Sequence, residues 1–340
     1  MQPLVSIISP TYNGATYLPS FLDSIYNQTY NNIELIIIND GSTDSTKIII
    51  DSYRQKFENR SINLIYEFQE NKGQAAAINL ALTKISSQSK FFMWVDSDDV
   101  LMKDNVLHKV QFLQQHPEFD LCLCNAVFSE YGSNYTSKPL TWRKAFSNGT
   151  LFENFLFGKN IVAGFGQGTV LVKKELLEKA IPQKRIYESR QGQNWQLMLP
   201  FTWYGKSGHL DEVLFKYIIH NDSHSHTKRT FEKQIERFTE FEILISETLI
   251  KIVDMKDSER VLYLNKIHEK YLKEKLSISY SMKHFLFAKK LKMQMRMENF
   301  LIPVYLRNFV FYFVYKTLRR IVYAPFIIFG HIRKVLRVTK

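Results

Sequence analysis

The first 130 residues alternate short apolar runs with segments in which apolar residues recur every three to four positions. The apolar runs are Val5–Ser9, Ile33–Ile38, Ile62–Phe68, Phe91–Val95 and Leu121–Phe128. The segments with helical spacing are Tyr17–Asn27, Ser45–Phe57, Gln74–Ile85 and Asn105–Gln115. Strands that are apolar on both faces and separated by helices are typical of a parallel sheet covered on both sides. Because crossovers between parallel strands are right-handed, the pattern predicts a doubly wound α/β layer.

The pattern is less regular after residue 130. Residues 161–172 are apolar and rich in glycine, a helix is predicted at 194–203, and a strand is predicted at 209–220. Residues 230–280 are highly charged, with apolar residues at helical spacing. A chain of 340 residues that is 45% hydrophobic can bury a sizeable core, as one large domain or as two ordinary ones.

The positive charge of the chain is concentrated at its C-terminal end. The formal net charge is +12, and residues 282–340 carry thirteen basic residues against one acid, Glu298. Twelve aromatic residues are interleaved with these cations, and the apolar runs are shorter than the roughly 20 residues that a spanning helix needs. This composition predicts helices that lie on an anionic membrane surface. A nucleic-acid-binding arm rarely carries so much apolar surface, so no nucleic-acid partner is expected. Burial against the rest of the chain or against a partner's transmembrane helix stays open.

Two cysteines in the whole chain exclude a disulfide scaffold and a four-cysteine zinc site. Cys122 and Cys124 lie two apart on a predicted strand, share one face, and are expected to be core residues. The N-terminal residues have no charged region ahead of their apolar stretch. We therefore expect a first strand in place of a signal peptide, and a catalytic part on the cytoplasmic side of the inner membrane, peripherally bound.

Polar residues follow three of the predicted strands. They form the segments Ser9–Gly14, Asn39–Asp44 and Asp96–Asp99. Ligands of such sheets bind beyond the carboxyl ends of the strands. Asn39–Asp44 taken alone is typical of a turn that caps a helix. Three acids within four residues repel one another unless a cation shares them, and an oxygen-only site suits Mg²⁺ or Mn²⁺ bound with a phosphate, although a solvated turn is the alternative.

Three stretches of the chain resemble glycosyltransferase family 2, the GT-A fold of nucleotide-sugar-dependent transferases. They are VSIISPTYNGATYLPSFLDSIYNQTYNNIELIIINDGSTDST, NKGQAAAIN and FFMWVDSDDVL. The resemblance is close over about the first 105 residues and looser to about residue 226. It implies an α/β GT-A domain at 1–226, Rossmann-like with a mostly parallel sheet and flanking helices. Within it, a nucleotide-binding half covers 1–105 and an acceptor-binding half covers 106–226. A helical extension at 227–281 and a basic amphipathic membrane-associating tail at 282–340 complete the predicted organisation.

The resemblance also implies roles for individual residues. The predicted nucleotide-sugar-binding residues are Pro10, Thr11, Tyr12, Asn13, Asp40, Asn79, Asp96 and Ser97, with Asp40 bonding the base or ribose. Asp96 and Asp98 stand at the D-x-D positions that hold Mn²⁺ or Mg²⁺ on the diphosphate, and Asp99 extends that motif as a catalytic candidate. The family implies inversion of the anomeric centre in a single displacement.

Two departures from the family pattern concern the charged groups of the site. Many relatives carry Arg-Asn where this chain has Ile78-Asn79, so a cation for the diphosphate is missing, and Arg190 is a candidate replacement. Many relatives also place the catalytic base in a Glu-Asp pair before a Trp or Tyr. This chain has Gln193-Asn194-Trp195 there, and amides cannot act as a general base at neutral pH.

Two explanations of the second departure are open. In the first, Glu188 is the base, and Gln193 and Asn194 bind sugar hydroxyls. In the second, residues 191–195 stand in for the Q-x-x-R-W element of processive synthases. The acceptor-binding candidates are Gln193, Asn194 and Trp195, and we expect Glu188 to be the base.

The segment YIIHNDSHSH at the end of the last predicted strand holds three histidines. His220 and Ser223 match a His-x-x-Ser pattern that relatives carry near the diphosphate, so His220 is a candidate ligand of the metal or phosphate. A zinc site formed with His224 and His226 is disfavoured, because no fourth ligand stands nearby.

The predicted function is transfer of a sugar from a nucleotide-sugar, with UDP as the expected nucleotide, to a glycan or lipid-linked acceptor. The expected setting is assembly of cell-surface polysaccharide, lipopolysaccharide or capsule. A nucleotidyltransferase is one alternative, but the first loop lacks the glycine-rich, basic phosphate site that it needs. A catalytically silent membrane-associated scaffold with the same fold is the other, and the amides of Gln193 and Asn194 favour it.

Overall fold

The computed structural model describes residues 2–133, 136–142, 145–146, 150–159, 167–190, 192–220, 229–313 and 315–316. The chain forms two compact units. The first, here the sheet unit, comprises Met1–Lys228 and Ile243–Arg260, and the second, the helical unit, comprises Arg229–Glu242 and Val261–Lys340.

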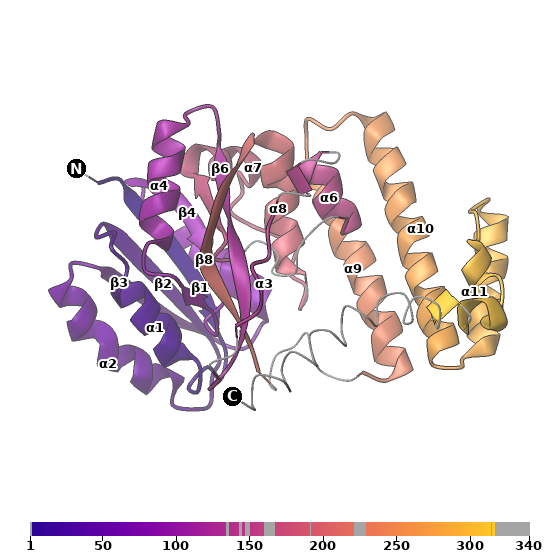
Figure 1. The fold of residues 1–340 in the computed structure, drawn as a ribbon, viewed down its shortest axis with the longest axis horizontal. Helices are drawn as coiled ribbons and strands as arrows, with labels where there is room; N and C mark the ends of the chain where they lie inside the picture. Colours follow the sequence, from indigo (N-terminus) through magenta and orange to yellow (C-terminus); the bar gives the residue numbers. More distant parts are fainter. Residues whose placement is uncertain are drawn as a thin grey trace, which may run out of the picture. The chain divides into compact units, whose positions relative to one another are not determined.

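The N-terminal half of the sheet unit is a run of four parallel strands. They are β1 (Leu4–Thr11), β2 (Ile33–Asp40), β3 (Asn63–Gln69) and β4 (Ser89–Trp94), adjacent in the order β3-β2-β1-β4 (Figure 1). The helices between them are α1 (Leu18–Tyr26), α2 (Thr46–Asn59) and α3 (Gln74–Lys84). Every residue of β2 is buried, as expected of a strand covered on both faces. The predicted parallel layer is confirmed here.

The other half of the sheet mixes directions. Its strands are β5 (Val100–Leu101), β6 (Leu121–Glu130), β7 (Val170–Lys173) and β8 (Ser207–Ile219), in the order β4-β7-β6-β8-β5. The short strand β7 is antiparallel to both β4 and β6, while β6 and β8 are parallel. The run Leu121–Phe128, predicted as one more parallel strand beside the first four, is therefore separated from them by an antiparallel strand.

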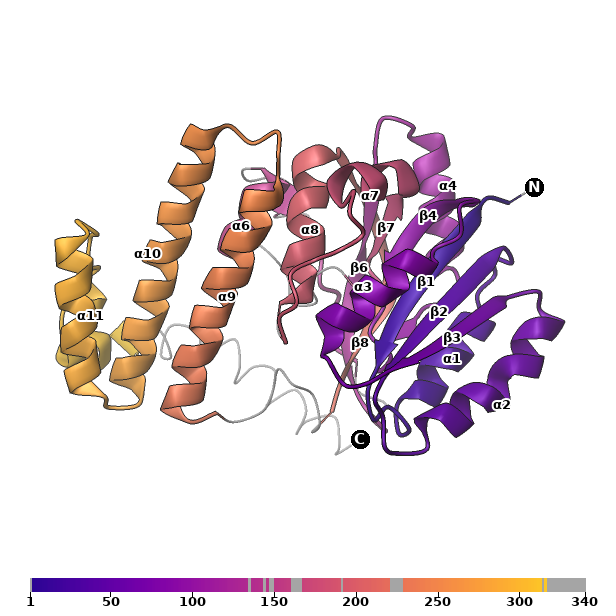
Figure 2. The same cartoon turned by 180° about the vertical axis from the view of Figure 1, so that it is seen from behind.

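Helices cover both faces of this sheet. α1, α2 and α4 (Asn105–Gln115) lie on one face (Figure 1), and α3, α7 (Lys174–Ala180) and α8 (Gln193–Tyr204) lie on the other (Figure 2). α6 (Leu151–Phe157) packs against α8. The thiols of Cys122 and Cys124 are free and buried in this core, as predicted.

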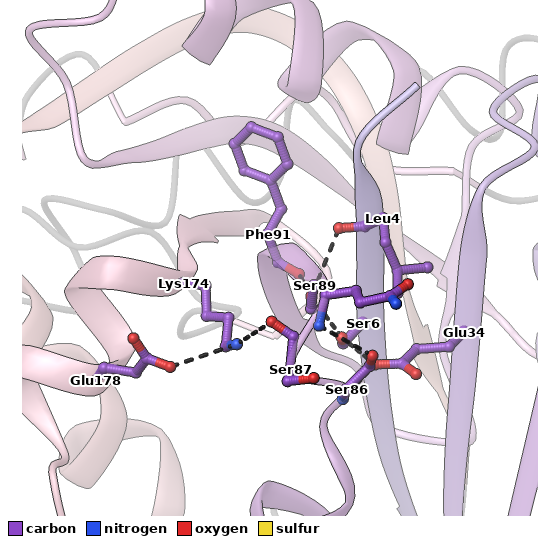
Figure 3. Close-up of polar contacts among 10 residues, drawn as sticks. Leu4, Ser6, Glu34, Ser86, Ser87, Ser89, Phe91, Lys174 and Glu178 are labelled. Carbon is purple, nitrogen blue, oxygen red and sulfur yellow. Dashed lines mark hydrogen bonds and ion pairs between the residues drawn. The ribbon is translucent and has the colours of Figure 1, made fainter. Parts of the chain in front are cut away.

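A buried carboxylate lies at the amino ends of the strands (Figure 3). The Ser6 hydroxyl donates a hydrogen bond to Glu34 Oε1, which also accepts the Ser86 N–H at 2.9 Å. The Ser6 and Ser89 hydroxyl oxygens are 2.6 Å apart, and Ser89 donates to the Phe91 carbonyl at 2.8 Å. The Glu34 carboxylate of β2 thus accepts hydrogen bonds from β1 and from the turn before β4. These bonds connect the starts of the two strands to that turn.

The helical unit is built on long helices. α9 (Phe231–Lys251) begins in this unit and ends in the sheet unit, and α10 (Asp257–Ser281) contributes its residues from Val261 on. α11 (Phe285–Met297) and a short 3₁₀ turn (Val304–Leu306) follow. Their apolar residues form one cluster with the C-terminal half of α10: Leu272, Leu276, Tyr280, Ala288, Leu291, Met295, Leu306 and Tyr312.

The predicted boundary between an extension at 227–281 and a tail at 282–340 falls inside this apolar cluster. Residues 285–312 pack on α10 because Ala288, Leu291 and Met295 recur at helical spacing. Among the described residues, the helices are all too short or too polar to cross a bilayer.

Candidate functional site

The loops that follow β1 and β2 are joined by hydrogen bonds at the carboxyl edge of the sheet. The bonds run from Asn13 N to Ser42 Oγ (2.9 Å), from Gly14 N to Thr46 Oγ1 (2.9 Å), from Ala15 N to Asp44 Oδ2 (3.0 Å) and from Thr43 N to Asn13 Oδ1 (2.9 Å). Asn13 has a left-handed backbone (φ 48°), which asparagine tolerates better than most residues. The two loops therefore form one fixed edge.

The first of these loops holds hydroxyl and aromatic groups. Thr11 is buried, and its Oγ1 has no hydrogen-bond partner among the described residues. A Cβ on Gly14 would lie 2.5 Å from that oxygen, so a larger residue there would displace the Thr11 side chain. Tyr12 is 49% exposed, whereas Pro10 is buried in β1. An exposed ring beside a buried hydroxyl suits a nucleoside, with the ring stacking and the hydroxyl available to bond.

Asp40 fixes the next loop along the edge. Its Oδ1 accepts hydrogen bonds from Gln69 Nε2 (2.7 Å) and Lys72 N (2.9 Å), and its Oδ2 accepts one from Gly73 N (2.9 Å). Both oxygens thus have protein donors, which anchor the β3–α3 loop to the end of β2. The predicted bond from Asp40 to a base or ribose stays a prediction.

Three carboxylates converge after β4. Asp96, Asp98 and Asp99 each offer an oxygen, and these oxygens lie within 4.8 Å of one another. Burial, and then the charge of Asp98, raise the pKa of Asp96 to about 7 against the hydrogen bonds that lower it. Burial and the charges of Asp98 and Asp96 raise the pKa of Asp99 well above its ordinary value. The cluster is thus a site where negative charge is costly until a cation shares it.

Each carboxylate of the cluster is held differently. Asp96 accepts hydrogen bonds from Gln74 Nε2 (2.7 Å) and from Gln167 Nε2. Asp99 is 1% exposed; its Oδ1 accepts the Ile218 N–H (2.8 Å), while its Oδ2 has no hydrogen-bond partner among the described residues. An orphaned, buried carboxylate oxygen beside two other acids fits a divalent cation such as Mn²⁺ or Mg²⁺.

His220 lies beside this cluster, and its predicted role as a ligand of the metal or phosphate stays a prediction. Its Nε2 is 2.9 Å from Asp98 Oδ2, and its ring stacks on Tyr17 with centroids 3.8 Å apart. Its Nδ1 is buried and has no hydrogen-bond partner among the described residues. The structure therefore brings Asp96, Asp98 and His220 together, whereas His224 and His226 lie outside the described residues.

Ser97 and Asn79 occupy different surroundings. The Ser97 hydroxyl lies 3.8 Å from where a Cβ on Gly14 would be, next to the first loop. The Asn79 amide pairs with the backbone of Ile186 in both directions, donating at 3.1 Å and accepting at 2.8 Å. Asn79 thus holds the segment that carries Glu188, and its predicted contact with the donor stays a prediction.

Glu188, the predicted base, is a partly exposed carboxylate in an ion pair. Its Oε1 is 2.8 Å from Arg185 Nη2 and 3.5 Å from Asn79 Nδ2. A Cβ on Gly73 would lie 3.3 Å from Arg190 Cγ, so Arg190 stands over the β3–α3 loop. Glu188 and Arg190 lie in the same segment, between α7 and α8.

The start of α8 reaches the end of β4. Asn194 Oδ1 accepts a hydrogen bond from Trp94 Nε1 at 2.9 Å, and Trp94 is the last residue of β4, two before Asp96. Trp195 Nε1 donates to the Phe155 carbonyl at 3.0 Å. Gln193 is the first residue of α8 and follows Gly192, whose φ is 69°. The amide of Asn194 is therefore held by the indole of the last residue of β4.

The two glutamines that hold Asp96 were missed from the sequence. An amide carries no charge, so neither Gln74 nor Gln167 stood out as chemistry. The available signal was position: Gln167 interrupts an apolar, glycine-rich run between two glycines, and a polar residue there predicts a specific partner.

Comparison with known proteins places this site in a family. A sequence profile described as glycosyl transferase family 2 matches residues 6–181. An uncharacterized glycosyltransferase of Rickettsia prowazekii is 36% identical over 141 residues, which are 41% of this chain and 42% of the relative. The Bacillus subtilis glycosyltransferase TuaG, whose name assigns it to teichuronic acid biosynthesis, is 28% identical over 239 residues, 67% of this chain and 83% of that one. The chain thus spans about two fifths of the length of the first of these relatives.

Solved structures share the fold. TarS of S. aureus (residues 1–349) in complex with UDP-GlcNAc superimposes with a TM-score of 0.61 at 19% identity, covering 82% of this chain and 76% of TarS. The mannosyltransferase PcManGT from Pyrobaculum calidifontis, in complex with GDP-Man and Mn²⁺, gives a TM-score of 0.53 at 17% identity, covering 87% and 76%. The predicted GT-A fold, a mixed α/β sheet with flanking helices and a helical C-terminal region, is confirmed.

Proposed function

The chain belongs to glycosyl transferase family 2, and from that premise we propose that it transfers a sugar from a nucleotide-sugar to a glycan or lipid-linked acceptor with inversion. The observation that carries the proposal is the cluster of Asp96, Asp98 and Asp99 at the carboxyl edge of the sheet. The expected nucleotide is UDP, and the expected setting is synthesis of cell-surface polysaccharide, lipopolysaccharide or capsule.

Asp96 and Asp98 would hold a divalent cation on the donor diphosphate, with His220 orienting Asp98. When bound, such a cation supplies Lewis-acid stabilisation of the charge that grows on the leaving diphosphate. Gln74 and Gln167 keep the Asp96 carboxylate in one orientation. The Tyr12 ring would stack on the nucleoside, and the Thr11 hydroxyl would form a hydrogen bond with it. Arg190 would supply the positive charge beside the diphosphate that Ile78 cannot supply.

Glu188 is the proposed general base. Its partly exposed carboxylate can accept a proton from an acceptor hydroxyl, and Arg185 and Asn79 hold it in place. Gln193, Asn194 and Trp195 would bind the acceptor. Glu188→Gln should lower kcat at least about a hundredfold with donor binding nearly unchanged. Glu178→Gln is the matched control, because Glu178 is also an exposed carboxylate paired with a basic residue, Lys174. A Glu188→Gln enzyme with normal turnover would reassign the base.

The proposed partner surface is an anionic membrane, with the protein peripheral on the cytoplasmic face. One side of α11 is exposed and apolar: Leu286, Met293 and Met297 are 81%, 62% and 69% exposed and share a helical face. Exposed cations flank this face: Lys289, Lys290 and Arg296. An apolar strip bordered by cations suits the headgroup boundary of anionic lipid.

Removal of residues after 281 would also remove part of the core of the helical unit, so substitutions test the membrane surface better. Leu286→Ser, Met293→Ser and Met297→Ser together leave the buried side of α11 intact. This triple variant should lose sedimentation with vesicles containing phosphatidylserine, and the wild-type protein should not bind vesicles of phosphatidylcholine alone. Undiminished sedimentation of the triple variant would move the membrane contact elsewhere in the chain.

Turnover of a panel of UDP- and GDP-sugars with Mn²⁺ tests the reaction itself. We expect Mn²⁺-dependent release of the nucleoside diphosphate from one donor, lost in Asp98→Asn. A nucleotidyltransferase would instead release pyrophosphate from a nucleoside triphosphate and a sugar phosphate. A silent scaffold would turn over none of the donors, with or without a glycan acceptor.

A further inference from the structure

Helix α4 buries two polar side chains that are four residues apart, Asn105 and Lys109, both 0% exposed. Both reach the same backbone oxygen: Lys109 Nζ lies 2.6 Å and Asn105 Nδ2 3.1 Å from the carbonyl of Gly168. Residues at this spacing lie on one side of a helix. The Gly168 carbonyl thus accepts two hydrogen bonds from α4.

Gly168 directly follows Gln167, whose side chain donates a hydrogen bond to Asp96. Gln167 is 6% exposed, and the turn continues through a hydrogen bond from Val170 N to its carbonyl at 3.0 Å. A Cβ on Gly168 would lie 2.6 Å from side-chain carbons of Leu101 and Phe215, so the backbone passes there in close contact. A single tight turn therefore connects α4 with the carboxylate cluster.

Packing alone does not account for a lysine at this position. Burial lowers the pKa of Lys109, and the ionisable groups around it are the thiols of Cys122 and Cys124, not carboxylates. An apolar side chain of similar volume, such as methionine, would fill the space without the cost of burying an amine. What methionine would not supply is the hydrogen bond to Gly168.

We propose that Lys109, together with Asn105, is a positioning residue that fixes the Gln167 turn and through it orients Asp96 for cation binding. This rests on the proposed function, in which Asp96 helps to hold a divalent cation. The Asp96 carboxylate has one donor from α3, Gln74, and one from this turn, Gln167. When the turn shifts, the carboxylate keeps only the Gln74 contact and rotates away from the geometry that the cation needs.

The test compares Mn²⁺ affinity, measured by calorimetry in the presence of UDP, in the full chain. Lys109→Met should weaken Mn²⁺ binding about tenfold, within the range that partners of metal ligands contribute. Lys109→Gln, which keeps a donor, should recover part of the loss. Cys122→Ala is the matched control: it alters packing beside Lys109 without touching Gly168, so it should lower Tm and leave Mn²⁺ affinity unchanged.

A double-mutant cycle separates positioning from general loosening. Gln167→Leu already removes the hydrogen bond between this turn and Asp96. Adding Lys109→Met to that variant should therefore not lower the Mn²⁺ affinity further. Additive losses in the cycle, or a Lys109→Met protein with wild-type affinity, would overturn the inference while leaving the proposed function intact. A wild-type protein that binds no Mn²⁺ with UDP would overturn both. Should Lys109→Met not fold, Gln167→Leu alone must show the tenfold loss, and wild-type affinity there also overturns the inference.

Discussion

Buried acids lie at both ends of the same sheet, and their surroundings differ. At the amino end, Glu34 accepts hydrogen bonds from the Ser6 hydroxyl and the Ser86 backbone. At the carboxyl end, Asp99 has one buried oxygen without a hydrogen-bond partner among the described residues, and Asp96 has a pKa of about 7. Glu34 and Asp99 are about equally buried, but the fold satisfies the hydrogen bonds of Glu34 and leaves one oxygen of Asp99 without a donor among the described residues. The hydrogen-bond donors around each acid, and not its burial alone, distinguish the structural carboxylate from those of the candidate site.

The largest effect is expected from a substitution in the carboxylate cluster at the carboxyl end of the sheet. Asp98→Asn removes a charge that the cation needs, so kcat/KM should fall by about a thousandfold or more. The free energy of unfolding without metal should not fall, because the substitution relieves repulsion with Asp96 and Asp99. Steady-state kinetics and urea unfolding of the same preparation measure both. Lost stability with retained activity would mean that this end of the sheet is structural, like the other.

The opposite result is expected at the amino end. Glu34→Ala leaves the Ser6 hydroxyl and the Ser86 N–H buried without their acceptor and should lower the free energy of unfolding by about 3 kcal/mol. Turnover per folded molecule should stay at the wild-type value, because Glu34 lies at the other end of β2 from the site. Urea unfolding measures the first and active-site-normalised kinetics the second. A selective loss of kcat would show that the two ends are coupled.

A smaller effect is expected from pH. Asp96 and Asp99 have raised pKa values in the folded protein, so between their ordinary pKa and about 7 the folded state binds more protons than the unfolded one. Without metal, stability should therefore decrease as pH rises through this window, and Tm should be a few degrees lower at pH 8 than at pH 5. Mn²⁺ with UDP should reduce the decrease, and so should Asp98→Asn. If the metal-free Tm rose in parallel over this pH range for the wild-type protein and for Asp98→Asn, the raised pKa values of Asp96 and Asp99 would be contradicted.

Apart from the two-residue strand β5, the strands, helices and acids of the first 105 residues were predictable, because each follows from a local pattern. Val5–Ser9 and Ile33–Ile38 are continuous apolar runs, and Asp96–Asp99 directly follows such a run. Their meeting at one edge follows from parallel pairing, which puts the carboxyl ends of neighbouring strands side by side.

The rest depends on contacts between distant segments. β7 has only four residues, too few for a pattern to fix its direction, so its antiparallel insertion between β4 and β6 was not foreseen. Gln167 contacts an acid 71 positions away, and no local pattern carries that pairing. Charge dominates the composition of the region after residue 282 and predicts a separate tail, whereas its buried side follows only from the helical spacing of Ala288, Leu291 and Met295.

The most direct measurement is a crystal of the protein soaked with Mn²⁺ and UDP, with data collected at a wavelength where manganese scatters anomalously. We expect one anomalous peak within about 2.3 Å of a carboxylate oxygen of Asp98, next to the diphosphate, and no peak at Glu34. Ordered UDP without a manganese peak at Asp98, or a peak bound elsewhere in the chain, would contradict the view that these acids gather to hold a cation.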